Sequence, residues 1–102
     1  MQKGDILVSS WGYGQTNIDF YKVVDTTPKS VKIVRIGQIV IDKETGHPLS
    51  EYVLPNENEI RGRVMTKRVK VFRSSGEQYV GINSYAIAQK WSGSPQFQSH
   101  WH

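Results

Sequence analysis

The residues best suited to binding chemistry form a basic run and an aromatic loop. Residues 61–73 carry six cations and no acid, and Trp11 and Tyr13 each precede a glycine in the sequence. Lysine and arginine can neutralise phosphates, while exposed rings can stack on unpaired bases. The same run also fits a solvated strand face, and Trp11 also fits a ring that plugs the core while the glycines make its turn. We predict a nucleic-acid-binding surface made of Trp11, Tyr13, Arg61, Arg63, Lys67, Arg68, Lys70 and Arg73.

A second polar group lies within one extended stretch of the chain. Asn17, Asp19 and Tyr21 are two residues apart, so in a strand their side chains share a face, which Ser9 or Ser10 can complete. Such a group could act in acid–base catalysis, but a carboxylate in this setting more often accepts structural hydrogen bonds. The chain also lacks the spacing of a Ser/His/Asp elbow, a phosphate-binding loop or a dinucleotide fingerprint. We therefore predict a binding protein with no catalytic residue.

Metal and cofactor chemistry has weak support in the sequence. The chain has no cysteine, which excludes disulfides and thiolate ligands. His100 and His102 are spaced so that they could share a transition metal, and His47 stands alone, but no further ligands accompany them. We expect no metal site and no cofactor.

Length and composition restrict the class of protein. The chain has 102 residues, a formal net charge of +4, 37% hydrophobic residues and 11% aromatic residues. This is enough for one folded domain, too apolar for a disordered tail, and too short for a multi-domain enzyme. The apolar runs are only a few residues long, and the first residues lack the pattern of a secretory signal. We expect a cytoplasmic protein with no membrane contact.

Short runs of β-branched and aromatic residues separated by turn formers predict strands. The first three are expected at residues 6–11, 17–24 and 31–36, with a hairpin turn at 25–30 and a bulge or bend at Gly37. Residues 42–59 contain five acids and read as a long acidic surface excursion with a brief strand near 52–54.

The second half of the chain predicts a basic hairpin and a helix. Residues 61–73 should form a strand with one apolar and one basic face, joined through a turn at 74–77 to a strand at 78–82. Ser84 can cap a helix of about two turns over residues 85–91. We predict a mainly β fold, a small antiparallel SH3-like barrel of about five to six strands with this short C-terminal helix. Residues 1–92 form the single domain, and residues 93–102 form a partly mobile tail.

Two stretches at the ends of the chain resemble a known group of proteins. Residues 4–13 and 15–24, and the closing residues 83–86 and 91–95, are similar to small uncharacterised proteins encoded by bacteriophages and other mobile elements. The resemblance implies a phage or mobile-element setting in a bacterial host, with nucleic-acid contact or inhibition of a host defence protein as its role. Gly14 replaces an acid common in that group, which argues against catalysis at this position. The alternative to nucleic-acid binding is therefore a protein–protein interaction, with the acidic span and the aromatic loop as its interface.

Overall fold

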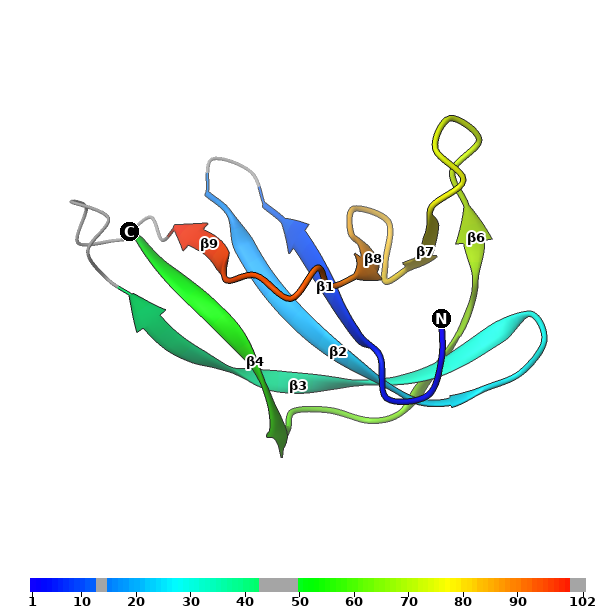
Figure 1. Ribbon diagram of the computed structural model, residues 1–102, viewed down its shortest axis with the longest axis horizontal. Helices are drawn as coiled ribbons and strands as arrows, with labels where there is room; N and C mark the ends of the chain where they lie inside the picture. The colour runs from blue at the N-terminus through cyan, green and yellow to red at the C-terminus, as the bar shows by residue number, and fades with distance from the viewer. Residues whose placement is uncertain (13–14, 43–49, 100–102) are drawn as a thin grey trace.

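The computed structural model describes residues 1–12, 15–42 and 50–99, and these form a mainly β structure with antiparallel pairing throughout (Figure 1). The prediction of a mainly β fold is confirmed, although the described residues contain more than five or six strands. The strands are β1 (Ile6–Trp11), β2 (Asn17–Thr26), β3 (Ser30–Asp42), β4 (Ser50–Ile60), β5 (Met65–Arg68), β6 (Lys70–Val71), β7 (Gln78–Gly81), β8 (Ile87–Lys90) and β9 (Gln96–Ser99).

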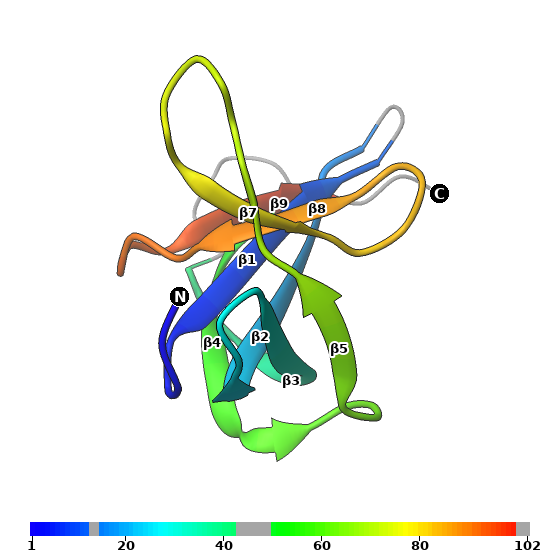
Figure 2. The same cartoon turned by 90° about the vertical axis from the view of Figure 1, so that its right-hand side faces the viewer.

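The strands follow one another in the order β6-β7-β8-β1-β2-β3-β4-β9, and β5 pairs with β3 off this path. Within the described residues no ladder joins β5 to β6 or β7, so the sheet is open and the predicted closed barrel is not confirmed. The chain itself links β5 to β6 through Val69, whose amide donates to the Lys29 carbonyl at 3.0 Å. Figure 2 shows β5 standing beside the β1–β2–β3 layer, with the chain rising from it towards β7. We call this unpaired boundary between β5 and β7 the seam.

The β2–β3 hairpin forms where turn residues predicted it. The Thr27 amide donates to the Ser30 carbonyl at 2.9 Å, and the Ser30 amide donates to Thr27 Oγ1 at 3.1 Å. The register of β3 against β4 shifts between Ile36 and Gly37, which confirms the predicted bulge. A Cβ at Gly37 would overlap the Glu59 carboxylate and lie 2.6 Å from its Cδ, so only glycine fits here without displacing that side chain.

The acidic segment contains much more strand than the sequence indicates. Residues 50–60 form β4, which pairs with β3 on one side and with β9 on the other. Val53 is completely buried in this strand, so tertiary packing outweighs the unfavourable strand propensity of the neighbouring asparagine and proline residues. Residues 96–99, assigned to the tail by the sequence, form β9. The rest of the predicted excursion, residues 43–49, lies outside the described residues.

The predicted C-terminal helix is wrong, because residues 87–90 form strand β8. Ala88 pairs with Val80 of β7 and is completely buried, while Gln89 pairs with Val8 of β1. A two-turn helix gains little on its own, whereas a strand at this position completes two ladders. The described residues contain no helix, and hence none that is long and apolar enough to cross a membrane.

The central strands bury side chains on both of their faces. One face holds a cluster built from β1, β2, β3, β7 and β8: Leu7, Tyr21, Val23, Val31, Ile33, Val80 and Ala88. The opposite face holds a second cluster, reinforced by an edge-on contact of the Phe20 and Trp91 rings at 6.3 Å: Ile18, Phe20, Val34, Ile36 and Val53. Because β2 contributes alternate residues to both clusters, it forms the rigid centre on which the surface sites are placed.

Candidate nucleic-acid interface

Pairing of β5 with β3 brings together cations from two separate parts of the sequence. Arg68 lies opposite Ser30, and Thr66 lies opposite Lys32. Directly opposite residues share a face of the sheet and residues two apart along a strand also share it, so Lys32 and Arg68 are diagonal neighbours at about 7–8 Å. This juxtaposition depends on strand register, which the sequence did not reveal.

A groove of about 340 Å³ runs between the β2–β3 hairpin and the β5–β6 segment. Its lining includes Lys29 and Arg68, the hydroxyl residues Thr27 and Ser30, and no acid. We call this groove, with its lining cations Lys29 and Arg68 and the adjacent Lys32 of β3, the basic groove. Among the described residues none of the three has an acidic oxygen within 4.0 Å. Within the part of the chain that the structure describes, the positive charge of the basic groove therefore has no direct acidic partner.

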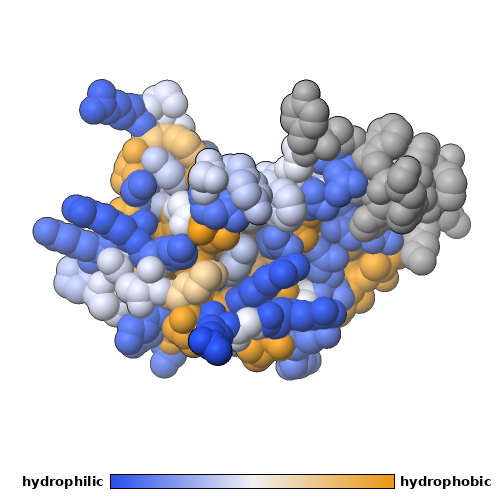
Figure 3. All heavy atoms as spheres, turned by 180° about the vertical axis from the view of Figure 1, so that it is seen from behind, coloured by the Kyte–Doolittle hydropathy of each residue, from blue (hydrophilic) through white to orange (hydrophobic). Residues whose placement is uncertain are grey.

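One acid lies close to these cations. Asp25 pairs in register with Lys32 across the β2–β3 hairpin, and its Oδ1 accepts a hydrogen bond from the Thr26 amide at 2.9 Å. Among the side chains the local balance is three cations to one carboxylate, and Met1, whose amino group carries a further positive charge, also lines the groove, so the basic groove keeps a positive charge. Figure 3 shows hydrophilic side chains projecting at the left-hand end of the molecule, the end where the β2–β3 hairpin lies.

The six cations predicted between residues 61 and 73 are dispersed. Lys67 points to the interior and its Nζ donates to the Ile82 carbonyl at 3.2 Å, bridging the seam. Arg61 pairs with Glu59 at 2.8 Å, whereas Arg63 is exposed beside it. Lys70 lies on β6 and Arg73 lies in the β6–β7 connection, both exposed. Of the predicted set, Arg68 alone belongs to the basic groove.

The aromatic residues are also separated. The Trp11 ring lies 5.3 Å from the Tyr85 ring, and its Nε1 donates to Asp19 at 2.7 Å. Tyr13 lies outside the described residues. A stacked pair that the sequence analysis missed, Phe72 and Tyr79 at 4.2 Å between ring centroids, lies at the base of the β6–β7 hairpin. Pairing of β6 with β7 brings these two rings together. The predicted hairpin between residues 61–73 and 78–82 was the sequence signal from which this contact could have been expected.

Asp19 is the centre of the polar network predicted on β2. Its two oxygens accept hydrogen bonds from Trp11 Nε1 and from Arg35 Nη2, the latter at 2.8 Å, and its side chain is only 14% exposed. Burial raises the pKa of the Tyr21 phenol above its ordinary value of 10.0, and the nearby charge of Asp19 raises it further. Ser9, opposite Asp19 in the β1–β2 ladder, is buried, and its Oγ has no hydrogen-bond partner within the described structure. The carboxylate is thus bound to two donors, as a structural network requires.

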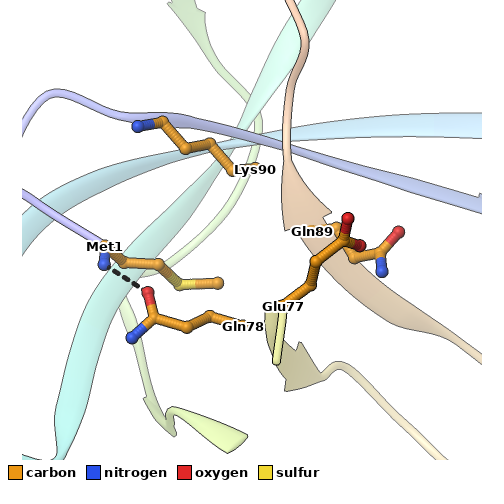
Figure 4. A pocket seen from close by; sticks show the side chains of 5 residues that line it. All are labelled: Met1, Glu77, Gln78, Gln89 and Lys90. Atoms are coloured by element: carbon orange, nitrogen blue, oxygen red, sulfur yellow. Dashed lines mark hydrogen bonds between the residues drawn. The ribbon is translucent and has the colours of Figure 1, made fainter. Parts of the chain in front are cut away.

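A further pocket, of about 320 Å³, lies where the N-terminus meets β7 and β8. In Figure 4 the Met1 amino group donates to Gln78, at 2.7 Å, with Glu77 and Lys90 also lining the pocket. Because this pocket combines one acid with two cationic groups, its net positive charge is smaller than that of the basic groove.

Among the described residues, no group of three or more acids and histidines could hold a metal ion. The three histidines considered as metal ligands, His47, His100 and His102, lie outside the described residues.

Comparison of the sequence and structure with protein-family models, curated proteins and solved structures gives no match. The resemblance to phage and mobile-element proteins is therefore a prediction that these comparisons do not support.

Proposed function

We propose that this protein binds nucleic acid through the basic groove, without catalysing a reaction. The observation that carries the proposal is a groove lined by Lys29, Arg68 and no acid, with Lys32 diagonal to Arg68 on the neighbouring strand. Phosphates would supply the missing counter-charge, and the hydroxyl group of Ser30 can donate to a phosphate oxygen.

Salt dependence gives this proposal a quantitative test. If three cations each neutralise one phosphate of a single strand, the logarithm of the affinity should fall with the logarithm of salt concentration with a slope of about −2.1. Replacing Lys32 and Arg68 by alanine should reduce the slope to about −0.7. The measurement is fluorescence anisotropy with labelled single-stranded and duplex DNA and RNA at several salt concentrations.

Two variants make the test specific. Lys90→Ala removes a cation that already lies 3.9 Å from Asp5, on a strand three positions from β3, and should change the affinity little. Asp25→Asn removes the acid beside the groove and should strengthen binding. A folded protein that binds none of the oligonucleotides at low salt, or one that responds equally to the Lys90 and Arg68 substitutions, would rule out the proposal.

A protein–protein interaction is the second candidate, and one observation favours it. At the opposite end of the molecule, β3, β4 and β9 expose apolar side chains: Ile39 is 47%, Ile41 46%, Tyr52 37% and Phe97 42% exposed. The Tyr52 and Phe97 rings are in contact at 5.7 Å. Exposed aromatic pairs are typical of binding surfaces. If oligonucleotides do not bind, the Phe97→Ala variant becomes the test of this surface, in a pull-down that compares it with the unaltered protein.

A further inference from the structure

A third pocket, on the inner side of β5, has a different chemistry from the basic groove. It has a volume of about 260 Å³, and its lining combines apolar groups with three arginines: Tyr21, Arg35, Arg61, Gly62, Arg63, Met65 and Ile82. Tyr21, Met65 and Ile82 supply an aromatic ring, a thioether and a branched alkyl group. The volume of this pocket is slightly below the range typical of small-molecule binding sites, so the pocket is large enough for one ring system.

Two of the three arginines around this pocket, Arg35 and Arg61, are held in position by the rest of the fold. Asp19 binds the Arg35 guanidinium at 2.8 Å, Glu59 binds that of Arg61 at 2.8 Å, and the Arg61 amide donates to the Arg35 carbonyl at 2.8 Å. These contacts fix the β4–β5 connection, which in Figure 2 turns at the foot of the molecule before rising as β5. Arg63 has no acidic partner among the described residues, so it offers one uncompensated charge at the pocket.

We propose that this pocket accepts a single unstacked base of a nucleic-acid strand, with the adjoining phosphate on Arg63. A planar ring between Tyr21, Met65 and Ile82 beside a positive charge matches the two parts of a nucleotide, and an arginine plane can also stack on the base. Bases of a duplex are stacked and paired, so this pocket selects single strands. The inference rests on the proposed nucleic-acid binding, because Met65 of the pocket and Arg68 of the basic groove are the two ends of β5, about 10 Å apart.

The two methionines of the chain provide separate probes for the two sites. Met65 lines this pocket, whereas Met1 lines the basic groove and the adjoining N-terminal pocket. In the 102-residue chain labelled with ¹³C in the methionine methyl groups, a ten-residue single strand of deoxythymidine should shift the Met65 signal upfield through the ring current of the inserted base. A duplex of equal length should shift the Met1 signal and leave Met65 unchanged.

The outcomes separate the two proposals. If the single strand shifts Met1 but not Met65, the base pocket is refuted and the basic groove stands; if neither signal moves at low salt, both proposals fail. Arg63→Ala should weaken single-strand binding about fivefold or more. Arg73→Ala removes the same charge from the distant β6–β7 connection and should have a smaller effect. Equal losses for the two variants on single strands would also refute the pocket.

Discussion

Replacing Asp19 by asparagine should destabilise the fold without affecting the basic groove. The carboxylate receives two donors, Trp11 Nε1 at 2.7 Å and Arg35 Nη2 at 2.8 Å, and is only 14% exposed. An asparagine has the same shape but only one acceptor oxygen, so its NH₂ group must face one of the two donors. A hydrogen bond to a charged group contributes about 1.5–3 kcal/mol, and a half-exposed ion pair at most about 1 kcal/mol. We therefore expect Asp19→Asn to cost about 2 kcal/mol, mainly through Trp11.

The ranking of related variants tests this account. Arg35→Gln should cost at most about 1 kcal/mol, because the Arg35 side chain is 52% exposed and regains hydration. Urea denaturation followed by tryptophan fluorescence measures each free energy of unfolding, and an unchanged m-value confirms that the denatured state is comparable. An Asp19→Asn protein as stable as the original, or an Arg35→Gln protein destabilised as much as Asp19→Asn, would refute the reasoning. If Asp19→Asn instead left stability intact and abolished a measurable catalytic activity, the carboxylate would be catalytic.

Two further predictions concern the bulge and the buried phenol. Gly37→Ala should cost at most about 1 kcal/mol, because the new methyl group displaces only the half-exposed Glu59 side chain and its ion pair with Arg61, whereas Gly81→Ala, with no atom within 4 Å, should be near neutral in the same urea titration. Adding Glu59→Ala should recover most of the loss; no recovery would place the strain elsewhere. The raised pKa of Tyr21 favours its neutral form in the folded state, so stability is full below pH 10.0 and falls as pH rises through the folded-state value. Thermal melts between pH 8 and 11 should show a shallower fall for Tyr21→Phe than for Tyr85→Phe, whose ring is 67% exposed, and equal slopes would contradict this.

Local turn chemistry was readable from the sequence, because it depends on residues close together in the chain. The hairpin closed by Thr27 and Ser30 and the bulge at Gly37 follow from side-chain hydroxyls and from a missing Cβ, and both are present. The sequence patterns predicted strands that were too short, or none at all, where the partner strands lie far away in the sequence. The acidic stretch around Val53 becomes a strand because β3 and β9 flank it, and Ala88 becomes part of a strand because β1 and β7 flank it.

The sequence predicted that the candidate site is positively charged, but not which residues form it. The sequence showed a basic run, but alternation along β5 sends Lys67 inward and Arg68 outward, and pairing with β3 adds Lys29 and Lys32. These two lysines lie 39 and 36 residues before Arg68 in the chain, and no local pattern connects them to it. The pocket beside Arg63 likewise requires the fold, since its lining comes from β2, β3, β5 and two connections.

The burial of both faces of β2 limits how this protein can change over evolution. Consecutive residues of the strand, such as Phe20 and Tyr21, belong to opposite core clusters, so substitutions at its buried positions disturb packing on one side or the other. New binding specificity cannot arise at these buried positions without a loss of stability. It has to arise where the chain turns, at the β2–β3 hairpin and the β4–β5 connection. Random mutagenesis restricted to those turns should therefore yield more folded variants with altered ligands than mutagenesis of the central strands.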